Sequence, residues 1–228
     1  MRVAAPELEA GDEESFATFY RQRVTDCTFL ADPNHYEYPR ARYILDRVRG
    51  GRLLEIGCGN GGMTRLLAPQ VAWLVAIDVS TPSLAELRAL ALPNVEVVEA
   101  LVERYQPAAT FDWIVMSEVL EHLRQPEEAI RRCVSWLAPG GTLLITTPNG
   151  HWESNEHLHE WNISSFARAL AQSGGETFTA GYLRDQDGRY RWLVGSVTAP
   201  TREVVASDFT ERWAVVKGRW KSRSRARR

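Results

Sequence analysis

The sequence predicts an α/β fold, a Rossmann-like three-layer sandwich with a mostly parallel seven-stranded sheet and a C-terminal antiparallel hairpin. Five short apolar segments alternate with helical patterns between residues 53 and 172, which is typical of a parallel sheet wrapped by helices. A glycine-rich turn separates the first of these strands from its helix. Two later apolar segments, at 176–183 and 190–197, are joined through Asp187-Gly188, a hairpin signal that places one reversed strand at the end.

The composition of the chain narrows its class. At 228 residues it fits one domain with appendages, and its net charge of −2 argues against binding nucleic acid through overall charge. The three cysteines, Cys27, Cys58 and Cys133, are widely spaced, which argues for a reducing compartment. Residues 1–14 lack the apolar core of a signal peptide, and no apolar run approaches the roughly 20 residues that span a bilayer. We therefore expect a cytoplasmic protein with no membrane partner.

Four regions are expected along the chain. Residues 1–14 form a disordered N-terminus and residues 15–50 an N-terminal helical lid, with helices near 15–24 and 39–48. The aromatic side chains of the second region pack on the sheet or cover a ligand, and Tyr38 and Arg40 are the candidates for ligand contact. Residues 51–199 form the core. Residues 200–228 are a basic extension, in which seven of the last twelve residues are lysine or arginine.

The first strand and the turn after it are the centre of the prediction. Residues 53–56 read as a buried strand, residues 57–62 contain four glycines, and residues 63–68 open a helix. Glycines let a ligand approach the backbone, and the amides of a helix start supply donors and partial positive charge. Together with Asp78, about twenty residues on, the glycines also fit a dinucleotide pattern. Glu55 favours a ligand with a positively charged amino group, which S-adenosylmethionine has and a dinucleotide lacks.

The remaining elements follow in order. A second strand at 72–78 ends in Asp78, and Ser80 and Pro82 begin a helix that runs to about residue 91. Strands are expected at 95–98, 111–117 and 142–147, and helices from Pro126 to the Pro-Gly-Gly at 139–141 and from Asn162 to about residue 172. Ligands of open α/β sheets bind outside the carboxyl ends of the strands. Asp78 should therefore face the ligand and accept hydrogen bonds from two ribose hydroxyl groups.

The segment after the fourth strand carries Glu118, Glu121 and His122. If it is helical, these side chains share one face. Three interpretations remain open: two acids at a helix start beside a packed histidine, a catalytic pair with His122 as general base and Glu118 beside it, or a divalent metal site. A metal site would use Glu118, Glu121 and His122, completed by His157 or His159. Our assignment is the catalytic pair, with no metal.

Several of these motifs together resemble one family. They are the run at 53–59, Asp78 at its strand end, the strand at 111–115 and the Leu-Ala-Pro-Gly-Gly at 137–141. In this order and spacing they resemble the class I (seven-stranded) S-adenosylmethionine-dependent methyltransferases over about residues 40–198. The resemblance implies S-adenosylmethionine as the cofactor and an enzyme that transfers its methyl group.

The resemblance also implies where the cofactor binds. Many members carry an aspartate near position 100 that bonds adenine, but this chain has Ala100 and Leu101 there. The adenine contact then falls to the backbone of Leu101 and Val102 or to Glu103. The expected cofactor-binding set, from methionine end to adenine, is Arg40, Glu55, Gly57, Cys58, Gly59, Asp78, Val79, Leu101, Val102 and Ser117.

The sequence leaves several alternatives for the acceptor, the molecule that receives the methyl group. We expect O-methylation of a small hydroxylated molecule, such as a sugar, a quinone precursor or a secondary metabolite, because no Asn/Asp-Pro-Pro-Tyr amine site is present. One alternative is a metal-dependent RNA 2′-O-methyltransferase. Glu118-x-x-Glu121-His122 and the later His157 resemble the enzymes that methylate small-RNA 3′ ends, and ubiquinone-pathway O-methyltransferases carry similar elements. Another alternative is a non-catalytic cofactor-binding scaffold. The sequence leaves the oligomeric state open.

Overall fold

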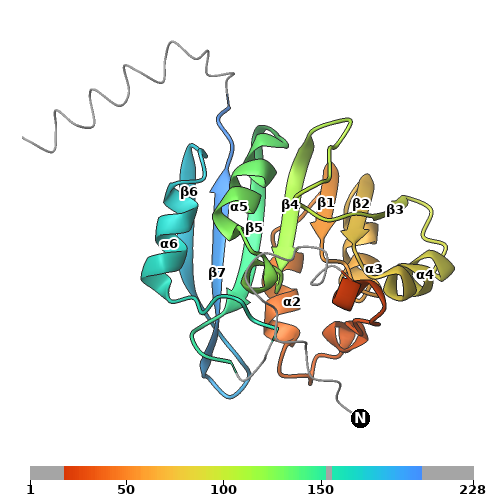
Figure 1. Ribbon diagram of the computed structural model, residues 1–228, viewed down its shortest axis with the longest axis horizontal. Helices are drawn as coiled ribbons and strands as arrows, with labels where there is room; N and C mark the ends of the chain where they lie inside the picture. Colours follow the sequence, from red (N-terminus) through yellow and green to blue (C-terminus); the bar gives the residue numbers. More distant parts are fainter. Residues whose placement is uncertain (1–17, 153–155, 202–228) are drawn as a thin grey trace, which may run out of the picture.

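A seven-stranded sheet runs through the centre of the molecule (Figure 1). The structure is a computed structural model, and it describes residues 18–152 and 156–201. The strand order is β3-β2-β1-β4-β5-β7-β6; the first five strands run parallel, and β7 is antiparallel to both of its neighbours. The strands are β1 (Arg52–Ile56), β2 (Trp73–Asp78), β3 (Val95–Glu99), β4 (Phe111–Ser117), β5 (Leu137–Pro148), β6 (Thr177–Arg184) and β7 (Tyr190–Thr198). The predicted fold class is confirmed.

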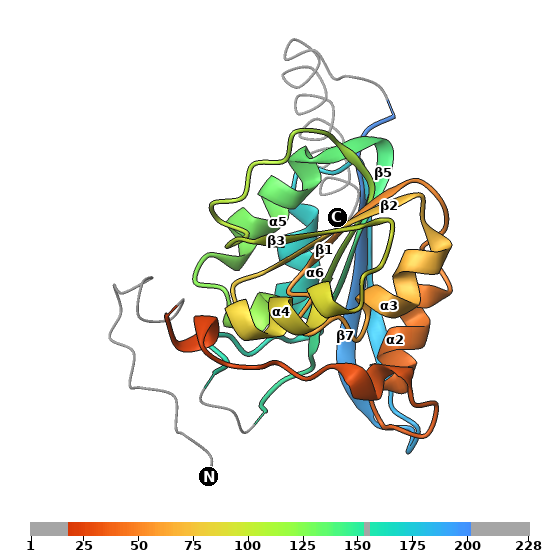
Figure 2. The ribbon, with the colours of Figure 1, turned by 90° about the vertical axis from the view of Figure 1, so that its right-hand side faces the viewer.

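Helices cover both faces of this sheet (Figure 2). Helices α2 (Tyr38–Leu45), α3 (Thr64–Leu67) and α4 (Thr81–Ala89) pack on one face, and α5 (Pro126–Ser135) and α6 (Ile163–Ala171) pack on the other. Alternate strand residues serve the two layers, because successive side chains of a strand point to opposite faces. Leu53 of β1 belongs to the first apolar layer and Leu54 to the second. The three-layer arrangement therefore follows directly from buried, parallel strands.

The hairpin is placed differently from the prediction. The reversed strand does not lie at the end of the sheet: β7 lies between β5 and β6, and β6 forms the edge. Burial explains the order, because Trp192, Leu193 and Val194 of β7 are buried whereas most of β6 is exposed or half-buried. The more apolar strand of the hairpin takes the interior position.

The Pro-Gly-Gly segment is also used differently. The predicted helix was to run to this segment, but α5 ends at Ser135, and β5 already begins at Leu137, which pairs with Phe111. The register shifts between Phe111 and Trp113. A Cβ atom at Gly141 would lie 2.8 Å from the Phe111 carbonyl oxygen, so close backbone approach requires glycine there. The segment forms the irregular start of a strand.

The N-terminal part is only partly described. Residues 18–21 are helical, a 3₁₀-helix η1 (Thr28–Ala31) follows, and α2 begins one residue before Pro39. The disordered N-terminus expected at 1–14 and almost all of the basic extension expected at 200–228 lie outside the described residues. Within residues 18–152 and 156–201, none of the helices combines the length and the apolar character needed to cross a membrane.

Candidate active site

A cavity of about 380 Å³ opens at the carboxyl ends of β1, β2 and β4. The strand order reverses here, since β2 and β3 lie on one side of β1 and β4 lies on the other. Such a switch point leaves a crevice in an open α/β sheet, and the volume is typical of a small-molecule site. Five of the expected cofactor-binding residues line the cavity: Gly57, Asp78, Val79, Leu101 and Val102. We call this part of the cavity the cofactor end.

The glycine turn (residues 57–62) and Asp78 are locked together. The Gly59 N–H donates to Asp78 Oδ2 over 2.8 Å, and the Ser80 N–H donates to Asp78 Oδ1 over 2.8 Å. Burial raises the pKa of Asp78, and these backbone donors act against that shift. Gly57 has φ +72°, and a Cβ atom there would lie 2.3 Å from Val119 Cγ2. The turn needs glycine, and it presents the Asp78 carboxylate at the cavity wall.

The other five expected cofactor residues do not line the cavity; they are Arg40, Glu55, Cys58, Gly59 and Ser117. Arg40 is buried, donates from Nη1 to Ser117 Oγ over 2.7 Å and forms an ion pair with Glu37. Among the described residues, Arg40 Nε and Glu55 Oε2 have no hydrogen-bond partner. Burial raises the pKa of Glu55 to about 8, against a smaller lowering by the Thr64 hydroxyl.

A covering segment explains why those residues lie behind the cavity wall. The N-terminal strap (residues 23–27) crosses the glycine turn: the Asn60 N–H donates to the Thr25 carbonyl over 3.1 Å, and the Cys27 N–H donates to Asn60 Oδ1 over 2.9 Å. A Cβ atom at Gly62 would lie 1.8 Å from the Cys27 carbonyl oxygen. The charges of Arg40 and Glu55 both act on the Cys27 thiol. The strap therefore packs close to the unpaired atoms of Arg40 and Glu55.

The segment after β4 is not a regular helix, so the condition for a common helical face of Glu118, Glu121 and His122 is not met. Glu118 has φ +55°, a left-handed conformation, and the 3₁₀-helix η3 begins only at Leu120. The Thr146 hydroxyl donates to Glu118 Oε1 over 3.0 Å, and the Thr147 hydroxyl donates to Glu121 Oε2 over 3.0 Å. Because successive side chains of β5 point to opposite faces, the two carboxyl groups are held on different sides of the strand end.

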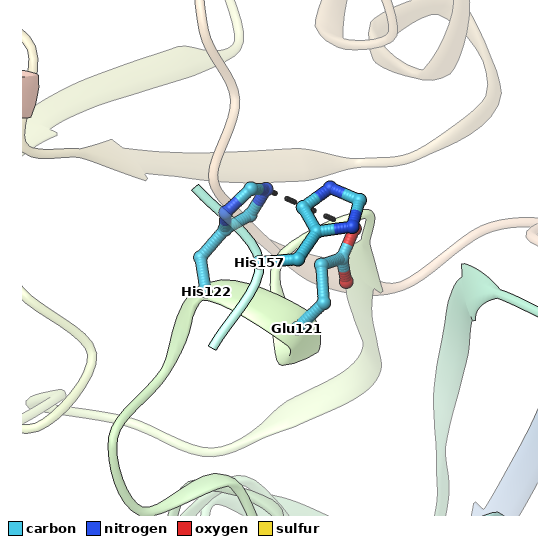
Figure 3. Close-up of side chains that lie close together, drawn as sticks. All are labelled: Glu121, His122 and His157. Carbon is cyan, nitrogen blue, oxygen red and sulfur yellow. Dashed lines mark ion pairs between the residues drawn. The ribbon is translucent and has the colours of Figure 1, made fainter. Parts of the chain in front are cut away.

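One acidic and two histidine side chains meet beside the part of the cavity that His122 lines, which we call the acceptor end. Glu121, His122 and His157 each offer an atom within 4.8 Å of the others (Figure 3). The structure thus brings together three of the four ligands considered for a metal site and leaves Glu118 outside that cluster. Glu118 and His122 both line the cavity, so the predicted catalytic pair lies at one site.

Burial shifts the pKa values of the carboxyl and imidazole groups at the acceptor end. It raises the pKa of Glu118 to about 8, although Arg40 acts in the opposite direction, and raises the pKa of Glu121 to about 7. Burial also lowers the pKa of His122, and burial together with His122 lowers the pKa of His157 to about 4. At neutral pH both imidazoles are therefore uncharged, and each has one nitrogen with a free lone pair to offer.

The hydrogen-bond partner of His122 shows which of its two ring nitrogens carries the free lone pair. Nδ1 lies 2.8 Å from the carbonyl oxygen of Glu156. A carbonyl oxygen only accepts hydrogen bonds, so Nδ1 carries the hydrogen and Nε2 carries the lone pair. His122 Nε2 lies 3.8 Å from Glu121 Oε1. The nitrogen that can accept a proton or bind a metal is therefore the one on the Glu121 side.

Sequence reasoning missed several residues of the acceptor end. Tyr20, Arg23 and Glu156 all line the cavity. Tyr20 lies 102 positions before His122, and Glu156 lies 34 positions after it. No local motif marks such residues. The only signal was the polar-aromatic character of the segment expected to form a lid.

Comparisons with known proteins agree on one family. A family model described as a methyltransferase domain matches residues 34–186. A ubiquinone biosynthesis O-methyltransferase of Xanthomonas campestris is 33% identical over 123 residues, which are 52% of this chain and 50% of that protein. The enzyme of the same description from Salmonella arizonae is 30% identical over 161 residues, which are 66% of each chain. The chain thus spans about half the length of the first of these relatives.

A comparison of structures gives the same fold. The N-methyltransferase NodS from Bradyrhizobium japonicum, solved with S-adenosylhomocysteine, aligns with a TM-score of 0.61 at 23% identity. The alignment covers 81% of this chain and 98% of NodS. At this identity the likeness extends to the fold and not to the acceptor.

Proposed function

The chain belongs to the class I S-adenosylmethionine-dependent methyltransferase family, and on this premise we propose that it methylates a hydroxyl group of a small molecule. The observation that carries the proposal is one continuous cavity with two chemically different ends. Asp78 and the glycine turn lie at one end, and His122 lies at the other. A cofactor and an acceptor bound in this cavity would face each other.

The cofactor end fits the parts of S-adenosylmethionine. Bound there, the cofactor supplies a methyl group activated on a sulfonium sulfur. Asp78 accepts hydrogen bonds from ribose hydroxyls, and the backbone of Leu101 and Val102 borders the adenine. Glu55 and Arg40 lie behind the strap and outside the cavity lining, and their unpaired atoms would complement the ammonium and the carboxylate of the amino-acid end once the strap moves aside. Leaving such buried groups unpaired costs about 1–3 kcal/mol each, so a ligand that pairs them gains affinity.

The acceptor end supports proton removal. His122 presents an uncharged Nε2 lone pair, which can accept the proton of an acceptor hydroxyl as its oxygen attacks the methyl group. Glu118, half-buried beside this position and hydrogen-bonded by Thr146, carries little charge at neutral pH. A general base typically contributes about 10²–10⁴-fold to a rate. Alignment of the two reactants contributes the larger share, roughly 7–11 kcal/mol.

The charge of the lining favours an acceptor without phosphate groups. Five acidic side chains line the cavity, Asp26, Asp78, Glu103, Glu118 and Glu156, and all but Glu118 contribute negative charge at neutral pH. Arg23, the arginine among the lining residues, is paired with Glu156. A polyanion would be repelled from such a surface, which supports a small uncharged acceptor over RNA. The names of the ubiquinone-pathway relatives support O-methylation in general terms.

A second candidate is a metal-assisted form of the same reaction. Glu121, His122 and His157 can meet at one ion (Figure 3). A buried carboxyl with a raised pKa beside two imidazoles with lowered pKa values is the pattern expected when a cation would complete the site. Glu121, His122 and His157 would hold the ion, which would lower the pKa of a bound acceptor hydroxyl so that its proton is released to solvent and not to His122. EDTA abolishes transfer under this candidate and leaves it unchanged under the first.

Transfer of a labelled methyl group tests the proposal. Full-length protein is incubated with S-adenosylmethionine carrying a labelled methyl group and with fractionated small-molecule extract, and the product is identified by mass spectrometry. We expect a neutral O-methylated product, lost in His122→Asn and retained in Tyr182→Phe, an exposed residue of β6. Label that appears only in RNA, or only on nitrogen, contradicts the proposal.

A further inference from the structure

We infer that Tyr20 is a positioning residue that ties the N-terminal segment to the turn after β5 and thereby holds His122 with its Nε2 lone pair available. This rests on the proposed function, because it assigns a task to the partners of the proposed base. It adds a residue that no motif pointed to and makes the reactive state of the base depend on closure of the cavity.

Tyr20 is the point where three distant segments meet. Its hydroxyl oxygen lies 3.1 Å from His122 Nδ1 and 3.1 Å from Glu156 Oε2. The rings of Tyr20 and His122 pack edge to face with centroids 5.7 Å apart. Residues 20, 122 and 156 come from the N-terminal segment, from η3 and from the segment after β5. Their contacts are therefore tertiary.

The contacts of His122 with Tyr20 and Glu156 indicate where the hydrogens of this network lie. His122 Nδ1 must donate, because the Glu156 carbonyl can only accept. The Tyr20 hydroxyl therefore cannot donate to Nδ1, and it donates to the Glu156 carboxylate, which also only accepts. Burial and the charge of Glu156 raise the pKa of Tyr20, so the phenol keeps its hydrogen. The guanidinium of Arg23 binds the other oxygen of the same carboxylate.

The network holds Glu156 from both sides. Its two carboxylate oxygens are bound by Tyr20 and Arg23 of the N-terminal segment, and its carbonyl oxygen is bound by His122. When the segment at 18–24 lifts, the Glu156 carboxylate loses Tyr20 and Arg23, and its carbonyl oxygen is held less firmly at Nδ1. The imidazole then adopts either tautomer, and in one of them Nε2 carries the hydrogen and cannot act as a base.

Closure of the segment at 18–24 therefore has two consequences, one for the base and one for the cavity. The same segment lines the cavity through Tyr20, Arg23 and Val24. In an open cavity, a base with an available lone pair would activate water for attack on the methyl group of the cofactor. If the lone pair becomes available only on closure, the methyl group is protected from this side reaction. Tyr20 does not touch the reacting atoms in this account; it acts through Glu156 and His122.

The tautomer can be read directly by NMR. Full-length protein labelled with ¹⁵N-histidine is studied at pH 8, free and with saturating S-adenosylhomocysteine, by two-bond ¹H–¹⁵N correlation. Five histidines make the spectrum tractable, and His122→Gln assigns its signal. We expect wild-type His122 with its hydrogen on Nδ1, and a mixture with at least a fifth of the other tautomer in Tyr20→Phe.

Control variants distinguish loss of the positioning contact from a general loss of structure. Glu156→Ala should mix the tautomers, whereas Glu156→Gln, which keeps an amide oxygen for Tyr20, should retain most of the Nδ1–H form. Tyr182→Phe removes an exposed hydroxyl on β6 and should leave the spectrum unchanged. If Tyr20→Phe fails to fold, the two Glu156 variants still decide the result.

Two outcomes overturn the inference: wild-type His122 with its hydrogen on Nε2, or a Tyr20→Phe spectrum identical to the wild type. Failure of the proposed function looks different. In that case calorimetry detects no binding of S-adenosylhomocysteine to the wild type, while the tautomer of the free protein can still be read.

Discussion

The two ends of the cavity are built in different ways. The cofactor end consists of strand ends and one turn, with Asp78 fixed by the backbone amides of Gly59 and Ser80. The acceptor end is assembled from side chains of three segments, with Tyr20, His122 and Glu156 held by one another. A site that only binds can be built from the sheet itself. Under the proposed function, the end that changes its protonation is built from three segments that lie far apart in the sequence.

Backbone strain follows the same division. At the cofactor end the left-handed positions are glycines, Gly57, Gly59 and Gly61, which adopt positive φ without penalty. At the acceptor end the left-handed position is Glu118, a half-buried residue whose carboxyl group has a raised pKa. Strain of this kind persists only where the surroundings impose it, and it gathers at reactive sites. This contrast can be tested by substitutions at each end.

The largest expected effect is on turnover at the acceptor end. His122→Asn removes the proposed base, so methyl transfer should fall by about 10²–10⁴-fold. Binding of S-adenosylhomocysteine should stay within about twofold, because a residue of the acceptor end contributes little to cofactor affinity. Labelled transfer and calorimetry on the same preparation measure both. An equal loss in both quantities would show that the two ends are not separate.

The next effect is on affinity at the cofactor end. Asp78→Ala removes a carboxylate that is proposed to bind two ribose hydroxyls, each charge-assisted bond contributing about 1.5–3 kcal/mol. The dissociation constant for S-adenosylhomocysteine should rise by about 100-fold or more. Asp78→Asn, which keeps acceptor geometry at one oxygen, should lose less. Calorimetric titration distinguishes them, and wild-type affinity in Asp78→Ala would remove the residue from the binding site.

A smaller effect concerns stability and pH. The pKa of Glu55 is raised to about 8 in the folded protein, whereas an unfolded glutamate has a pKa of about 4.3. Between these values the folded state binds the extra proton, so the free protein loses stability as pH rises from about 5 to 8.

Glu55→Gln tests this effect because it cannot ionise. It should raise the melting temperature at pH 8 and flatten that pH dependence, while weakening S-adenosylhomocysteine about tenfold through loss of a charged partner. Thermal unfolding at pH 5.5 and pH 8 provides the measurement. Equal wild-type stability at both pH values would show that Glu55 ionises freely when folded.

The smallest expected effect is a difference in stability that reports the backbone strain at Glu118. Glu118→Ala and Glu118→Gly both remove the carboxyl group, and they differ only in the Cβ atom. Because the residue has φ +55°, the glycine variant should be more stable than the alanine variant by about 1 kcal/mol, the reverse of the order at an ordinary helical site. Chemical denaturation of the pair gives the difference. The same order as at helical sites would mean that the turn relaxes without strain.

The sequence predicted the fold and the cofactor end because both depend on local patterns. Buried strands, the glycine turn and the acid at the end of β2 are each written within a few residues, and the sheet aligns their ends. The order of the last two strands was missed, because it depends on comparing the burial of β6 with that of β7.

The acceptor end was predicted only in part for the same reason. Glu118 and His122 were found through a short motif, but their common face depended on a helix that does not form, since Glu118 is left-handed and the 3₁₀-helix begins only at Leu120. Tyr20 and Glu156 could not be found, since nothing local relates residues that lie 136 positions apart. The strap across the glycine turn was missed likewise, which is why Glu55 was expected at the cavity surface.

The most direct test of the account is to map S-adenosylhomocysteine on the full-length protein by ¹H–¹⁵N chemical-shift changes of the backbone amides. The account predicts saturation at one ligand per chain, with the largest changes at Gly57, Val79 and Leu101 and small ones at Glu156. No saturable change, or changes confined to residues 118–123 and 156–159, would contradict the claim that the two ends of this cavity hold the two partners of a methyl transfer.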